Sequence, residues 1–109
     1  MTVSGAIGVC SGQIGVADGQ LVKGVIPQLR QALRNVDAVL AMAGASLDDV
    51  FKVTLYLTDI GHYSAVNEEY VEWFPQHPPA RTAVQVSGLP MGAAVEVEAW
   101  FRSTARSAM

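Results

Sequence analysis

Two glutamates near the C-terminal end of the chain are candidates for a chemical role. Glu96 and Glu98 are separated by one residue, so in a strand both side chains leave the same face while Val95 and Val97 leave the other. The apolar neighbours of Glu96 favour a partly buried carboxylate, which needs a cationic partner. Glu98 is explained equally well as a solvent-exposed residue, because glutamate is nearly always exposed.

Arg81 is the candidate cation and also a candidate ligand-binding residue. It follows the proline-rich connector 75–79 and begins a predicted strand, which would hold its guanidinium rigidly. Such a group binds a carboxylate through two parallel N–H···O bonds, so Arg81 fits recognition of a carboxylic acid as well as an ordinary ion pair with glutamate. If strands 81–86 and 95–102 form a hairpin, its register decides whether Arg81 and Glu96 share a face.

Other reactive residue types carry weaker signals. Ser11-Gly12-Gln13 is a weak motif of small residues that allows close approach to the backbone. The single cysteine, Cys10, is expected to be a buried apolar residue, and His62 and His77 to be surface residues. The chain has no nucleophile elbow, no glycine-rich phosphate loop and no cysteine or histidine cluster with metal-ligand spacing. Acyl transfer, nucleotide chemistry and metal binding therefore have no support.

Length and composition limit the possible classes of protein. The chain has 109 residues and a formal charge of −3, and we expect one domain over residues 1–109. Only 16% of the residues are charged, against about 25% in an average soluble domain, which favours an obligate oligomer. There is no basic run, so nucleic acid is an unlikely partner. Without a membrane-length apolar segment or a signal peptide, the expected location is the cytoplasm.

The elements that must position these residues follow from periodicity. Apolar spacing predicts helices over 25–42 and 65–74, and Asp18-Gly19 predicts a hairpin turn. Strands are predicted over 6–10, 50–57, 81–86 and 95–102, and the hairpin around Asp18-Gly19 adds one more before the first helix, which gives the order β-β-α-β-α-β-β. A mixed sheet with two helices on one face is an α+β fold whose other sheet face needs cover, and oligomerisation would supply it.

Several segments taken in series resemble the RidA/YjgF family of reactive-intermediate deaminases. They are Ser11-Gly12-Gln13, Val66-Asn67-Glu68-Glu69-Tyr70, Pro79-Ala80-Arg81-Thr82-Ala83-Val84, Leu89-Pro90 and Val95-Glu96-Val97-Glu98-Ala99. The resemblance implies a chorismate-mutase-like fold and a homotrimer, with the helices outside, the sheets packed into a central barrel and ligand sites at the clefts between subunits.

The resemblance also implies an activity and a set of site residues. The family hydrolyses enamines and imines such as 2-aminoacrylate to 2-keto acids and ammonia, without a cofactor or metal. Its carboxylate-binding arginine corresponds to Arg81, and its water-positioning, proton-relaying glutamate to Glu96. The remaining substrate-binding positions correspond to Ser11, Gly12, Asn67 and Ala83. Ala83 stands where the family carries a cysteine, so only its main chain would contribute.

The N-terminus also departs from the family pattern, and this leaves alternatives open. The family's Gly-Pro-Tyr-Ser-Gln segment, whose tyrosine reaches the site, is expected to be missing, because the chain starts ten residues before Ser11. We favour a 2-iminobutanoate/2-iminopropanoate deaminase-like hydrolase. The alternative is a non-catalytic trimer that binds small carboxylates such as 2-keto acids. The endoribonuclease or translation-initiation-inhibitor activity of some members fits least, since the net charge is negative.

Overall fold

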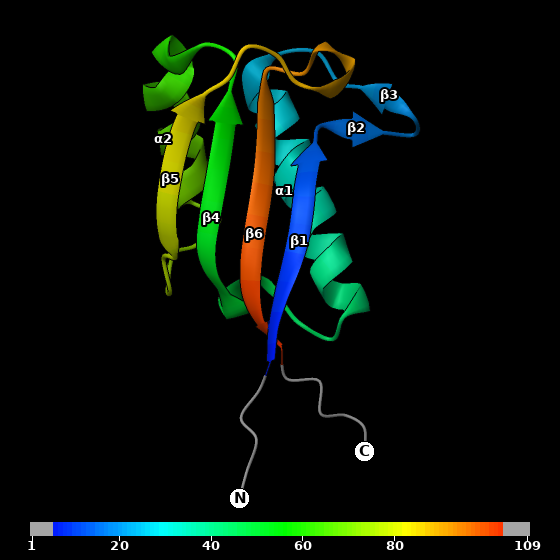
Figure 1. Ribbon diagram of the computed structural model, residues 1–109, viewed down its shortest axis with the longest axis vertical. Coiled ribbons are helices and arrows are strands. Elements are labelled where there is room, and N and C mark those ends of the chain that lie inside the picture. Colours follow the sequence, from blue (N-terminus) through cyan, green and yellow to red (C-terminus); the bar gives the residue numbers. More distant parts are fainter. Residues whose placement is uncertain (1–5, 104–109) are drawn as a thin grey trace, which may run out of the picture.

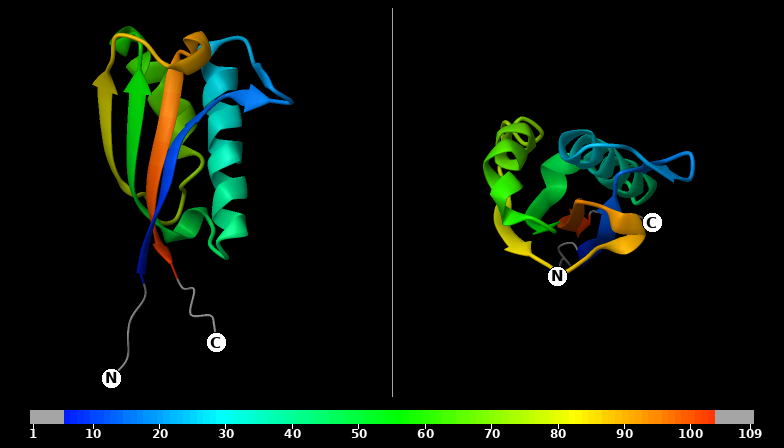
Figure 2. Two further views of the ribbon diagram at one scale, coloured as in Figure 1. Left: turned by 45° about the vertical axis from the view of Figure 1, so that its right-hand side comes forward. Right: turned by 90° about the horizontal axis from the view of Figure 1, so that it is seen from above.

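The computed structural model describes residues 6–103, which form one mixed sheet, two helices and a small hairpin (Figure 1). The four strands of the sheet lie in the order β1 (Ala6–Ile14), β6 (Val95–Ser103), β4 (Val50–Leu57) and β5 (Ala80–Gln85). β6 is antiparallel to both β1 and β4, whereas β5 is parallel to β4. The helices α1 (Val25–Met42) and α2 (Tyr63–Val71) lie on the same side of the sheet (Figure 2). The predicted α+β architecture is confirmed.

Helix α1 has the predicted bounds and supplies one layer of the core. Its buried residues recur at three- and four-residue spacing, which places them on one face: Gln28, Leu29, Ala32, Leu33, Val36 and Leu40. The helix ends at Met42 as predicted, and Gly44, two residues beyond, has a left-handed φ of 76°. The N–H groups of Gly44 and Ala45 donate to the carbonyls of Ala41 and Leu40, which is the Schellman pattern of hydrogen bonds.

The predicted hairpin exists as a separate two-stranded ribbon, β2 (Val16–Ala17) and β3 (Gln20–Leu21). Asp18 and Gly19 have φ values of 53° and 78°, as a two-residue turn between antiparallel strands requires. The ribbon projects from the body beside α1 (Figure 2). The Asn35 amide anchors its base by donating to two main-chain carbonyls at 3.0 and 3.1 Å. Three strands therefore precede α1, where the sequence predicted two.

The second helix differs from its prediction at both ends. A 3-10 turn, η2 (Ile60–His62), leads directly into α2, so the helix begins at Tyr63 rather than at the predicted residue 65. The helix ends at Val71, before the predicted limit of 74. The apolar periodicity nevertheless continued to Phe74, because this side chain remains in the core, 5% exposed, although its backbone has left the helix.

The last two strands do not form a hairpin. β4 lies between β5 and β6 in the sheet, and α2 is the crossover that parallel pairing of β4 with β5 requires (Figure 1). In this register Arg81 is the partner of Val53, whereas Glu96 is the partner of Tyr56. The sequence could not supply this order, because the connection 86–94 is as compatible with an adjacent strand as with a strand two positions away.

The two faces of the sheet have different surroundings. The face toward the helices is buried, and it carries alternate residues of the two central strands: Val53, Leu55, Leu57, Val95, Val97, Ala99 and Phe101. The opposite face, called the open face below, is not covered by any described element (Figure 2). It carries exposed apolar side chains, namely Ile7, Val9, Trp100 and Val84, with exposed fractions of 63%, 49%, 40% and 37%. Among residues 6–103, no helix is long and apolar enough to span a membrane.

Candidate functional site

Glu96 lies on the open face, directly above the small residues of β1. The ladder between β1 and β6 is irregular between Cys10 and Gln13, and this irregularity brings Gly12 beneath the glutamate. A Cβ atom built on Gly12 would stand 1.8 Å from Glu96 Oε2 and 2.5 Å from its Cδ. The absence of a side chain at Gly12 thus leaves room for the Glu96 carboxylate in this position.

Glu98 also lies on the open face and is only partly exposed. The Tyr56 hydroxyl donates to Glu98 Oε1 at 3.3 Å. Partial burial, together with the negative charge of Glu98, raises the pKa of Tyr56. Glu98 therefore has a hydrogen-bond partner within its own sheet and is not simply a solvated residue.

Arg81 lies on the helix face of the sheet, beneath α2. Its guanidinium donates one hydrogen bond to Asn67 Oδ1 and another to the Tyr63 hydroxyl. The two acceptors are four residues apart on α2, so they lie on the same side of the helix. Arg81 is half-buried, and its placement on β5, an edge strand, leaves it at the rim of the molecule. Asn67, which the resemblance places among the substrate-binding residues, accepts one of the hydrogen bonds of this arginine.

Two tyrosine rings complete the surroundings of Arg81. Its Cζ atom lies 5.3 Å from the ring centroid of Tyr63 and 5.0 Å from that of Tyr70, within the range of cation–π attraction. Tyr70 is 3% exposed, and its ring packs against Phe74 with the centroids 5.1 Å apart. Burial raises the pKa of Tyr70 to about 12. The Tyr70 hydroxyl has no hydrogen-bond partner among the described residues.

Arg81 and Glu96 do not meet within one chain. Their strands are separated by β4, and their partners on β4, Val53 and Tyr56, point to opposite faces of the sheet. Val53 and Tyr56 are three residues apart, which adds an offset of about 10 Å along the strand direction. The two charged residues could therefore contact one small molecule only if they came from different copies of the chain.

The remaining predicted site residues divide between the same two places. Ser11 is exposed on β1 beside Gly12, close to the Glu96 side of the molecule. Ala83 is on the helix face of β5, opposite Leu55, and its side chain packs against the core. The structure thus contains one group of Ser11, Gly12 and Glu96 and a second group around Arg81.

The sequence analysis does not identify Tyr63 as a site residue, because Tyr63 precedes the predicted start of the second helix at residue 65. The signal that could have found it is the spacing of Tyr63, Asn67 and Tyr70 at positions i, i+4 and i+7. This spacing aligns three polar or aromatic side chains along one side of a helix. It was hidden because the helix begins two residues earlier than predicted.

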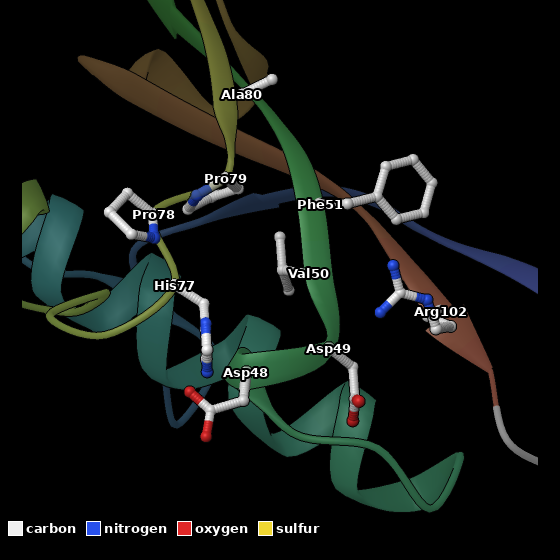
Figure 3. Close-up of a pocket in the computed structure, with 9 residues that line it drawn as sticks. All are labelled: Asp48, Asp49, Val50, Phe51, His77, Pro78, Pro79, Ala80 and Arg102. Atoms are coloured by element: carbon white, nitrogen blue, oxygen red, sulfur yellow. The ribbon is translucent and has the colours of Figure 1, made fainter.

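The structure also contains a cavity of about 330 Å³ at the end of the sheet away from Glu96 (Figure 3). His77, Asp48 and Arg102 contribute polar side chains to its lining, and Pro78 and Pro79 contribute apolar surface. It contains none of the predicted site residues. Cys10 lies elsewhere and is buried as predicted, with the pKa of its thiol raised by burial. Within residues 6–103, no group of three or more potential metal ligands is present.

Comparison with known proteins confirms the family that the sequence segments resemble. The chain belongs to the family described as Endoribonuclease L-PSP, the RidA/YjgF family, whose family model matches residues 1–102. A RutC family protein of Pyrococcus horikoshii is 50% identical over 82 residues, which cover 74% of this chain and 65% of that protein. The human 2-iminobutanoate/2-iminopropanoate deaminase is 45% identical over 92 residues, or 82% of this chain and 67% of that protein. The chain thus spans less than two thirds of the length of the first of these relatives.

Solved structures have the same fold. TdcF of E. coli, solved with bound serine, has a TM-score of 0.85 and 34% identity, over 94% of this chain and 85% of that chain. Yeast Mmf1 has a TM-score of 0.88 and 31% identity, over 94% of this chain and 83% of that chain. The order of strands and helices described above is therefore the fold of this family.

Proposed function

We propose that this protein hydrolyses small 2-imino acids and their enamine tautomers, such as 2-aminoacrylate, to 2-keto acids and ammonia. The observation that carries this proposal is the presence of both charged site residues: Arg81 is held in place beneath α2, and Glu96 lies above Gly12. Relatives with 45% and 47% identity are named 2-iminobutanoate/2-iminopropanoate deaminase, which supports the same reaction.

The reaction takes place in clefts between copies of the chain, because Arg81 and Glu96 are too far apart in one copy. Ile7, Val9 and Trp100 give the open face an apolar surface that association with other copies would bury. The likeness to the RidA/YjgF family supports a homotrimer, in which each cleft takes Arg81 from one subunit and Glu96 from its neighbour. Closed cyclic symmetry then produces three identical clefts.

The two charged residues have different roles in the proposed reaction. The Arg81 guanidinium binds the substrate carboxylate and fixes the orientation of the iminium carbon. Glu96 accepts a proton from a water molecule as the water oxygen bonds to that carbon, which gives a tetrahedral carbinolamine. Glu96 then returns this proton to the amine. As the C–N bond breaks, Glu96 takes the proton of the carbinolamine hydroxyl, so the carbonyl of the 2-keto acid forms, and the proton leaves with the departing ammonia. The overall balance is one imine and one water consumed for one keto acid and one ammonia.

The test is a coupled assay in which 2-aminoacrylate or a bulkier imine is generated in situ and the release of keto acid and ammonia is followed. The wild-type chain is expected to accelerate release, and Arg81→Ala and Glu96→Gln are expected to return it to the uncatalysed rate. Absence of acceleration by the wild type, combined with calorimetric binding of pyruvate, would replace the deaminase with a carboxylate-binding protein. TdcF, solved with bound serine, supports a small carboxylate as the ligand in either case.

A further inference from the structure

The Arg81 guanidinium is held by more contacts than an edge-strand arginine needs for folding. One terminal nitrogen donates to Asn67 Oδ1, and the other donates to the Tyr63 hydroxyl. The residue is only half-buried, so water could have satisfied these donors instead. Two acceptors from α2 thus fix the direction in which the fork of the guanidinium points.

The tyrosine rings restrict the guanidinium in a second way. The ring centroids of Tyr63 and Tyr70 lie 5.3 and 5.0 Å from Arg81 Cζ, within the range of cation–π attraction. The guanidinium is therefore restrained by these two rings in addition to the hydrogen bonds at its terminal nitrogens. Only Tyr63 contributes both a ring and a hydroxyl contact, because the Tyr70 hydroxyl has no partner among the described residues.

The N–H groups of Arg81 that do not bond to α2 remain available for a ligand. A guanidinium has five N–H groups, and the two hydrogen bonds to α2 leave about three for a ligand. An arginine side chain otherwise samples many rotamers, and ordering it on binding costs affinity. A guanidinium fixed in advance avoids that cost and presents a pair of N–H groups to a planar, bidentate carboxylate.

We propose that Tyr63 is a positioning residue for carboxylate recognition, which acts by holding Arg81 in its ligand-binding orientation. This inference rests on the proposed function, since it assumes that Arg81 receives the substrate carboxylate. Tyr63 itself does not touch the substrate. Its hydroxyl fixes one terminal nitrogen of the guanidinium while Asn67 fixes the other, and together they set the angle at which a carboxylate must approach.

The test compares Tyr63→Phe with the wild type, because this change removes one oxygen atom and keeps the ring. Binding of pyruvate and of pyruvamide, an uncharged analogue of the same shape, is measured by titration calorimetry. We expect pyruvate to bind about tenfold more weakly to Tyr63→Phe, and pyruvamide to bind unchanged. Trp73→Phe is the matched control, since it removes the 3.2 Å hydrogen bond that Trp73, just beyond α2, donates to Glu69. Among the described residues, the hydrogen-bond and cation–π partners of Arg81 are Asn67, Tyr63 and Tyr70, not Trp73. It should bind both compounds as the wild type does.

The outcomes separate this inference from the proposed function. Equal pyruvate affinity in wild type and Tyr63→Phe would overturn the positioning role alone. Equal weakening of pyruvate and pyruvamide would also overturn it, because it would indicate a change in cleft shape rather than in recognition of charge. If the wild type neither binds pyruvate nor hydrolyses imines, carboxylate recognition by Arg81 is wrong and both proposals fail together.

Discussion

Arg81 and Glu96 lie on opposite faces of one sheet, with β4 between the strands that carry them. The arginine faces α2, and the glutamate stands over Gly12 on the open face. A reaction that uses both residues must therefore join two copies of the chain, and this requirement can be tested without a structure of the assembly.

Mixing two inactive variants should restore activity. Co-expression of Arg81→Ala with Glu96→Gln produces some clefts that take an intact arginine from one copy and an intact glutamate from the other. Random assembly leaves about a quarter of the clefts intact, so we expect about a quarter of the wild-type rate in the imine assay. Each variant expressed alone serves as the control. A mixture that stays at the uncatalysed rate would mean that the two residues do not share a cleft.

Gly12→Ala should impair the reaction without unfolding the protein. The added Cβ would occupy the position of the Glu96 carboxylate, which is the flexible end of its side chain and can move aside. A displacement of about 1 Å in a catalytic group can lower the rate by about a hundredfold. We expect that loss in kcat, with a thermal midpoint close to that of the wild type. Gly88→Ala is the control, because nothing lies within 4 Å of its added Cβ; comparable losses in both variants would contradict the steric explanation.

Trp100→Glu should prevent self-association. Trp100 is paired with Val9 across β1 and β6, and both are exposed on the open face. A charge at the centre of an apolar interface costs several kcal/mol if it is buried without a partner, so the variant should remain a monomer. Light scattering after size-exclusion chromatography measures the mass directly. Met42→Glu, at an 88% exposed position at the end of α1, should leave the mass at three chains; a wild-type monomer would exclude the proposed clefts.

Tyr70→Phe should alter stability at alkaline pH. Because the folded pKa of Tyr70 is raised to about 12 from 10, the folded state favours the neutral phenol. The raised pKa of Tyr70 therefore contributes fully to the free energy of unfolding below pH 10, and this contribution is lost as the pH rises through 12. The difference corresponds to about 3 kcal/mol of unfolding free energy. Urea unfolding measures the free energy of unfolding at pH 8 and at pH 11.5. This free energy should fall less between the two pH values for Tyr70→Phe than for the wild type.

At neutral pH the same Tyr70→Phe variant should be about as stable as the wild type, since the hydroxyl that it removes has no partner among the described residues. A strongly destabilised variant at pH 8 would show that the Tyr70 hydroxyl has a partner, for example a bound water. Identical alkaline losses in the two proteins would instead show that another group titrates in this range.

The sequence by itself predicted the two helices, the four strands of the main sheet, the open face of that sheet and the charged residues that could do chemistry. Helix α1 was predicted to its last residue, because the apolar spacing of its core positions and the glycine at its end are local signals. The alternation along β6 likewise placed Glu96 and Glu98 on one face and Val95 and Val97 on the other. The family resemblance assigned Arg81 and Glu96 from local motifs alone, and the comparison with known proteins confirmed the family.

The tertiary structure alone decided which of these residues can act together. Insertion of β4 between β5 and β6 is a long-range choice that no local pattern encodes, and it places Arg81 and Glu96 on opposite faces. The contact between Tyr63 and Arg81 is likewise a tertiary one, because it joins the first residue of α2 to β5. The local sequence specifies the periodicity of the apolar residues and the face of a helix or strand on which each side chain lies. The order of the strands, and the contacts between side chains distant in sequence, depend on how the whole chain buries its apolar surface.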